Sequence, residues 1–225
     1  MPVHSSRFAL DLPDDFPIRL LEAVHGVISD ADDARRQTSE WSEWAGACNG
    51  VLYRFLACAE HADLLDTSLA SSTSPPQPER YEQEKLLYEF FAEGLSALEC
   101  LYYGVYFIGV LADSRLDASV DRRLVNPRFV TECFESTFPV DAITTCLREV
   151  LADAEYERWR DTRNVLSHRA APGRDFRIGG DDAGTYWMEG TLGTNTIVSR
   201  RTWLASTIEK LLTAFRRFVD ERLSG

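Results

Sequence analysis

The sequence predicts a mainly α-helical protein with a small β-ribbon before its C-terminal helix. Apolar residues recur at helical spacing over most of the chain, prolines and glycines interrupt this pattern at a few points, and one stretch near residue 180 alternates short apolar groups with turn sequences. With 44% hydrophobic and 27% charged residues, the 225-residue chain lies in the globular range. We therefore expect a single domain over residues 1–225, with a β-ribbon insertion at 173–200 and the C-terminal helix at 201–225.

The first half of the chain predicts three helices. Residues 17–36 form the first, with Asp14 and Asp15 at its N-cap, and residues 40–69 form the second. The sequence SSTSPPQP at 71–78 cannot continue a helix and indicates a linker. Residues 79–112 are the longest periodic segment and end in an aromatic and aliphatic run, which predicts the central core helix.

The second half predicts shorter elements. Helices are expected at 127–135 and 139–152, each beginning with a proline that suits a first helical turn. The next helix covers 154–170 and is stopped by Pro172 and Gly173. A final amphipathic helix covers 201–223. Between these two helices the sequences GGDDAG and EGTLGTN are typical of turns. The residues around these turns are expected to lie in short strands: Phe176, Ile178, Tyr186, Met188, Thr191, Ile197 and Val198.

Charge and cysteine content limit the classes of function. A net charge of −12 argues against non-specific coating of nucleic acid, which needs a basic field. Only Lys85 and Lys210 are lysines, so the basic residues are almost all arginines; this suits phosphate recognition, although biased codon usage explains it equally well. The five scattered cysteines indicate reduced core thiols in a cytoplasmic protein. The apolar run at 101–112 is too short to span a bilayer, so no membrane association is expected.

The segment 156–177 carries the most specific signal. It contains six arginines against three acidic residues, so it is locally basic in an acidic chain. On a helical wheel its polar residues fall within an arc of about 160°. In order these residues are Arg163, Ser167, Arg160, Asn164, His168 and Asp161, and the opposite side holds Val165, Thr162, Leu166 and Trp159. An apolar back therefore anchors the helix while its polar face is free to meet a substrate or a partner.

This polar face has the groups needed to cut RNA without a metal. His168 is expected to act as acid or base, because imidazole titrates near neutral pH. Arg163 is expected to stabilise the negative charge that gathers on the phosphorus, and Asn164, four residues before His168, to orient a phosphate oxygen or the imidazole. One histidine per chain is marginal for a reaction that needs both an acid and a base. A homodimer that joins two such faces would supply both.

The sequence RNVLSH at 163–168 resembles the Arg-(four to six residues)-His motif of the HEPN superfamily (higher eukaryotes and prokaryotes nucleotide-binding). The resemblance implies a HEPN-like helical bundle, with this motif on a late helix, and a metal-independent endoribonuclease that leaves a 2′,3′-cyclic phosphate. It further implies a toxin–antitoxin or phage-defence role, with an antitoxin or nucleotidyltransferase as possible partner. Arg163 and His168 take the catalytic roles and Asn164 a supporting one. The neighbouring residues expected to bind RNA are Arg160, Ser167, Arg169 and Arg174.

Other residues of the chain offer weaker candidates for a functional site. Arg19 with His25 and Arg54 with His61 also match the motif spacing, but Leu20 and Phe55 follow these arginines and both stretches lack further arginine neighbours in front of the histidine. The acidic residues Asp30, Asp32, Asp33 and Glu40 indicate solvated surface, and neither a metal nor another cofactor is expected. Two alternatives stay open: an ordinary amphipathic surface helix, and a non-catalytic HEPN-like module that binds nucleotides or proteins.

Overall fold

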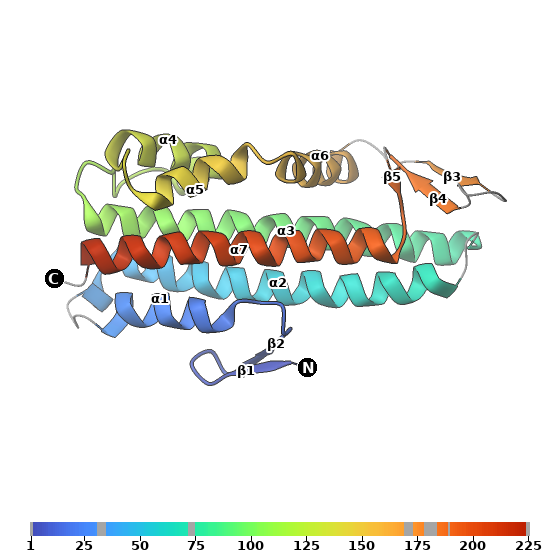
Figure 1. Cartoon of the computed structure of the whole chain (residues 1–225), viewed down its shortest axis with the longest axis horizontal. Coiled ribbons are helices and arrows are strands. Elements are labelled where there is room, and N and C mark those ends of the chain that lie inside the picture. The colour runs from blue at the N-terminus through green and yellow to red at the C-terminus, as the bar shows by residue number, and fades with distance from the viewer. Residues whose placement is uncertain are drawn as a thin grey trace.

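The computed structural model describes residues 2–30, 35–71, 75–168, 173–177, 184–188 and 190–223. Long helices lie side by side in an elongated bundle, and shorter helices cover one face of it (Figure 1). Small antiparallel strand groups lie at two places outside the bundle. The fold is therefore mainly α with a small β-ribbon, as the sequence predicts.

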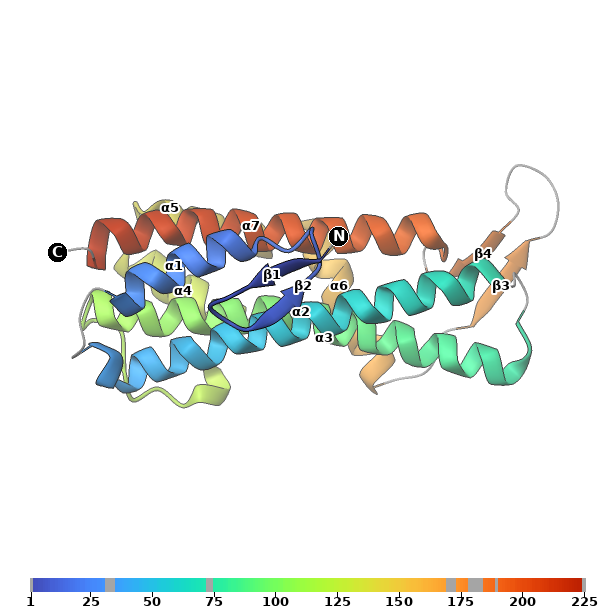
Figure 2. The same ribbon diagram turned by 90° about the horizontal axis from the view of Figure 1, so that it is seen from below.

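Two long helices, α2 (Ser39–Ser71) and α3 (Gln77–Ala112), form an antiparallel hairpin that is the centre of the bundle (Figure 2). Both agree closely with the predicted ranges. Arg54 of α2 donates to Glu93 of α3 at 2.7 Å, and this ion pair fixes the register on the surface. At Gly104 a β-carbon would lie 2.7 Å from the ring of Trp44, so the glycine lets the large indole pack against α3.

The N-terminal region differs from the prediction in two ways. The described part of helix α1 is Ile18–Asp30, and residues 35 and 36, predicted as its last residues, belong instead to a 3₁₀ turn, η1 (Arg35–Gln37), that precedes α2. A short hairpin of β1 (Val3–Ser5) and β2 (Leu10–Leu12) was not predicted. Three-residue strands leave too little alternation to recognise. The buried hydroxyl of Ser5 donates to Glu22 of α1 at 2.6 Å and so ties this hairpin to the bundle.

Three shorter helices follow α3: α4 (Pro127–Thr137), α5 (Ala142–Leu151) and α6 (Ala154–His168). Between α3 and α4 lies the 3₁₀ turn η2 (Arg122–Leu124). The α4 helix begins with a proline, as predicted, and the side chain of Asn126 caps it by accepting from the amide of Phe129. By contrast α5 begins three residues after Pro139, because the backbone first turns and Thr144 donates its hydroxyl to the carbonyl of Phe138.

The predicted β-ribbon is present but shorter than expected. It contains β3 (Arg174–Arg177), β4 (Gly184–Trp187) and β5 (Gly190–Thr191), paired antiparallel in that order. The last helix, α7 (Thr194–Leu223), begins seven residues before the predicted residue 201. Ile197 and Val198 are therefore helical, and their assignment to a strand was wrong. Ile197 is buried, seven residues before the buried Leu204, so it belongs to the same helical stripe. The predicted strand residue Ile178 lies outside the described residues.

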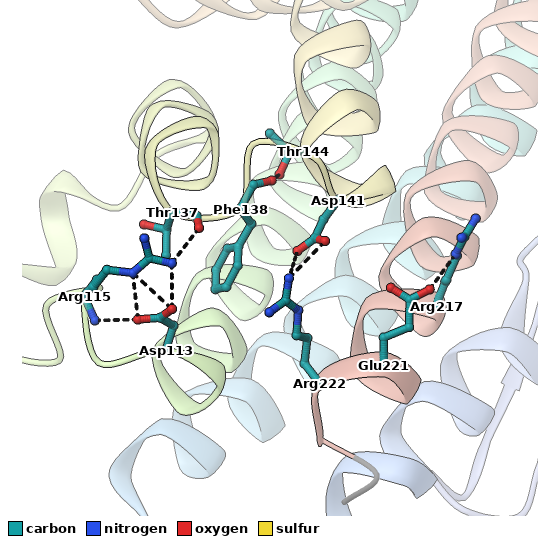
Figure 3. A network of polar contacts seen from close by, with 9 residues as sticks. All are labelled: Asp113, Arg115, Thr137, Phe138, Asp141, Thr144, Arg217, Glu221 and Arg222. Carbon is teal, nitrogen blue, oxygen red and sulfur yellow. Dashed lines mark hydrogen bonds and ion pairs between the residues drawn. The ribbon is translucent and has the colours of Figure 1, made fainter.

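Polar contacts close the end of the bundle at which α7 finishes (Figure 3). Arg222 of α7 donates to both carboxylate oxygens of Asp141, at 3.0 and 3.2 Å, and its guanidinium lies over the ring of Phe138. Arg115 binds Asp113 and also donates to the carbonyl of Thr137 at 2.8 Å. These arginines join α7 and the loop after α3 to the turn between α4 and α5.

The α3 helix is long and apolar enough to cross a membrane by length and composition. However, 61% of its apolar window is buried inside the bundle, as in the core helix of a soluble protein. Its burial by α2, α4, α6 and α7 explains the aromatic run that the sequence places there.

Candidate functional site

The motif helix α6 is anchored to α3 by one tryptophan. Trp159 is completely buried, and its ring lies 5.0 Å from the rings of both Phe90 and Phe91. A β-carbon at Gly94 would lie 2.3 Å from this indole, so the glycine makes the close approach possible. Thr162, three residues further along α6, is also buried. This is the side of the helix that the sequence predicts to face the core.

Arg163 lies at the edge of this contact and is held by α3. Its Nη2 donates to Oε1 of Glu99 at 3.2 Å, and the side chains of Arg163 and Glu99 are 30% and 37% exposed. The Nε of Arg163 is buried and has no hydrogen-bond partner. The guanidinium is thus fixed by Glu99 while part of the side chain stays open to solvent, and the unsatisfied Nε is not accessible from that open side.

The Glu99 carboxylate has an unusual environment for a surface ion pair. Burial raises its pKa above the ordinary value of 4.5, and the nearby Arg163 opposes this rise by charge and by hydrogen bonding. Burial also raises the pKa of Tyr156 on α6 to about 12, and the charge of Glu99 adds to that rise. Sequence reasoning missed Glu99 as a site residue. The only indication in the sequence was that Glu99 stands just before the apolar run at 101–112.

The other predicted site residues fall into three groups. Asn164 and Ser167 are half-buried on α6. Arg160 is 39% exposed and donates to the neighbouring Asp161 from Nε and Nη2, at 3.3 and 3.2 Å. His168 is the last described residue of α6; its side chain lies outside the described part of the structure, as does the whole of Arg169. The separation of the guanidinium and imidazole groups therefore stays a prediction.

Arg174 lies inside the fold, away from any surface that could bind RNA. Its side chain is only 1% exposed, its Nε donates to Glu84 at 2.9 Å, and its Nη1 makes a short hydrogen bond to Gln83. Both acceptors belong to the first half of α3. Arg174 thus fixes strand β3 to the bundle, and we leave it out of the proposed RNA surface.

The described residues include no group of three or more histidine, cysteine, aspartate or glutamate side chains placed to hold a metal ion. Comparisons with family models, with curated proteins and with solved structures gave no match to this chain.

Proposed function

We propose that this protein is a metal-independent endoribonuclease of the HEPN type, with the polar face of α6 as its catalytic surface. One observation carries the proposal: Arg163 of the motif is held by Glu99, on a helix that Trp159 locks to the core, while its side chain stays 30% exposed. A fixed guanidinium is favourable for transition-state stabilisation, because little reorganisation is needed when charge develops on the phosphate.

In the proposed reaction the 2′-hydroxyl of RNA attacks the adjacent phosphorus and the 5′-oxygen leaves, so that a 2′,3′-cyclic phosphate forms. Arg163 binds the non-bridging oxygens through its guanidinium. His168 transfers a proton, a role worth about 10² to 10⁴ in rate. Asn164 orients the phosphate or the imidazole. Two copies of the face, in a homodimer, provide one histidine as base and the other as acid.

The proposal includes a role for Glu99 as the positioning residue for Arg163. The carboxylate holds the guanidinium in place before RNA arrives, and it also competes with phosphate for the same donors. A phosphate group that approaches Arg163 must therefore share its guanidinium with Glu99 or displace it. Glu99 thereby sets how strongly the site attracts RNA.

The biological setting is proposed from the resemblance alone. A cytoplasmic ribonuclease of this type would act as the toxin of a toxin–antitoxin or phage-defence system, restrained by an antitoxin or a nucleotidyltransferase partner. Its overall charge of −12 fits a selective encounter with RNA at one locally basic face better than tight general binding.

A second candidate function is a non-catalytic nucleotide-binding or protein-interaction module. The Arg163–Glu99 ion pair favours it, because a guanidinium neutralised within its own chain is a weaker partner for a scissile phosphate. In this case the Arg163–Glu99 ion pair only stabilises the fold, and the polar face of α6 binds a partner without catalysing a reaction.

Incubation of the purified protein with bulk RNA in EDTA tests the two candidates. We expect fragments with 2′,3′-cyclic phosphate ends, and we expect Arg163→Ala or His168→Ala to lower cleavage at least about 100-fold while circular dichroism is unchanged. Matched controls are Arg217→Ala and His4→Ala, which remove exposed side chains far along the chain from α6. Absence of cleavage by the wild type, or equal cleavage by the motif variants, would overturn the ribonuclease.

A further inference from the structure

One face of α3 is open to solvent and leads to Arg163. On a helical wheel at about 100° per residue, its members fall within an arc of about 80°. Each of them is exposed or half-buried: Tyr81, Lys85, Tyr88, Ala92, Ser96 and Glu99. These residues form the α3 face. It begins near the tip of the α2–α3 hairpin (Figure 2) and ends at Glu99, which holds the guanidinium of Arg163.

A lysine stands between two tyrosines at the outer end of the α3 face. Tyr81 is 66% exposed and Tyr88 is 42% exposed. They lie four residues before and three residues after Lys85, so the three side chains are neighbours on the helix surface. Lys85 is exposed and has no ion-pair or hydrogen-bond partner among the described residues. A free cation between two exposed rings suits single-stranded nucleic acid, which binds through its phosphates and through bases that stack on aromatic side chains.

Most of the carboxylates beside the α3 face are held by other elements. Three of them contact side chains of β3 and α2: Glu84 with Arg174 at 2.9 Å, Glu89 with His61 at 3.2 Å and Glu93 with Arg54 at 2.7 Å. Glu82, one turn before Lys85, is exposed and would repel an anion. A phosphate that approaches Lys85 therefore meets one competing carboxylate nearby rather than the acidic surface that the composition of α3 suggests.

Between Tyr88 and Glu99 the α3 face has small side chains. Ala92 and Ser96 are half-buried, so a strand can pass close to the helix there, and the hydroxyl of Ser96 can donate or accept a hydrogen bond. At 1.5 Å per residue the distance along α3 from Tyr88 to Glu99 is roughly 17 Å. A stacked strand that advances roughly 3.4 Å per nucleotide covers this distance with about five nucleotides.

We propose that an unpaired RNA strand bound at Arg163 continues along the α3 face toward the hairpin tip. Lys85 binds a phosphate of the strand, and Tyr81 and Tyr88 stack on its bases. Stacking and a single cation do not read a base sequence, so this face sets the affinity and the requirement for an unpaired strand. The inference rests on the proposed ribonuclease in one respect, because it takes Arg163 as the point of cleavage.

Fluorescence anisotropy with an uncleavable strand tests the binding. The probe is a labelled single strand of about ten nucleotides, within the usual footprint of roughly 4 to 16, and is 2′-O-methylated so that no 2′-hydroxyl can attack. Tyr81→Ala or Tyr88→Ala should weaken binding at least about fivefold, whereas Tyr88→Phe keeps the ring and should bind as the wild type does. Lys85→Ala should weaken binding and reduce the slope of log affinity against log salt by about 0.7. Lys210→Ala, which removes the other lysine of the chain from α7, is the matched control and should change neither. Glu82→Gln should strengthen binding.

Cleavage of a long and a short substrate separates this inference from the ribonuclease proposal. Tyr88→Ala and Lys85→Ala should raise the KM for an RNA of about ten nucleotides at least fivefold. Both variants should cleave a ribodinucleotide as the wild type does, because a dinucleotide at Arg163 is too short to reach Tyr88. Unchanged cleavage of both substrates would overturn the α3 face and leave the ribonuclease standing.

The binding measurements decide the α3 face even where no cleavage occurs. If the wild type cuts neither substrate, but binds the methylated strand through Lys85 and the two tyrosines, the α3 face stands and the ribonuclease falls. The α3 face is overturned if the strand does not bind at about 0.1 mM protein, the weak end of non-specific binding. It is also overturned if Tyr88→Ala and Lys85→Ala bind like the wild type, or if a duplex of the same sequence binds as tightly as the single strand.

Discussion

Removing the guanidinium of Arg163 should destabilise the protein more than removing the charge of Glu99. Burial is the largest influence on the Glu99 carboxyl group and favours its neutral form, so Glu99→Gln replaces a group that already suffers from desolvation. We expect this change to cost less than about 1 kcal/mol. Arg163→Met leaves a partly buried carboxylate without its partner, which should cost about 1 to 3 kcal/mol.

The coupling between the two side chains should be about 1 kcal/mol at pH 7. Both groups are about one third exposed, so solvent screens the pair, and its value should lie near the upper end of the range of roughly 0.2 to 1 kcal/mol for exposed pairs. Urea unfolding of the wild type, Glu99→Gln, Arg163→Met and the double variant measures this coupling free energy. A coupling free energy below about 0.3 kcal/mol, or a larger loss of stability from Glu99→Gln than from Arg163→Met, would refute this role of the ion pair.

Acidification provides an independent check on the same pair. Because the pKa of Glu99 is raised in the folded state, its contribution to stability is fully present below 4.5 and is lost as the pH rises through the raised value. The wild type should therefore gain stability relative to Glu99→Gln as the pH falls from 7 toward 4.5. Over the same range the coupling to Arg163 should shrink, since the neutral carboxyl group no longer attracts the guanidinium. A pH-independent difference between the two proteins would contradict this account.

Three further changes follow from the fold. Gly94→Ala should destabilise the protein by about 1 to 3 kcal/mol in thermal or urea unfolding, because the added β-carbon would meet the buried indole of Trp159 on α6. Gly46→Ala on α2 adds a β-carbon in open space and should stabilise the protein by up to about 1 kcal/mol. Hydrogen bonds from the side chain and the backbone N–H of Arg115 lower the pKa of Asp113 to about 2, so its stabilising effect is present above pH 3.8 and lost as the pH falls toward 2. NMR titration of Arg115→Ala should show a higher carboxyl pKa that is still below the ordinary 3.8, because the backbone N–H of residue 115 still donates to Asp113. Arg174→Met breaks a buried pair and should lower stability by about 3 to 5 kcal/mol; a loss of RNA affinity with unchanged stability would show that the buried placement is wrong.

Local sequence was enough to predict most of the helical elements and the buried side of the motif helix. The apolar period of α3 and the proline at the start of α4 depend on local backbone and side-chain preferences, which each segment carries without its neighbours. The burial of Trp159 and Thr162 follows from the same period, because one side of α6 is apolar enough to need a core.

Which groups meet across elements depends on the folded chain as a whole. Glu99 and Arg163 are 64 residues apart, and nothing in either local sequence encodes their ion pair. Arg174 belongs to an arginine-rich segment that suggests RNA, yet β3 folds back on α3 and buries its guanidinium against Glu84. A side chain's type fixes its chemistry, but its charge, exposure and pKa depend on the distant residues that fold around it.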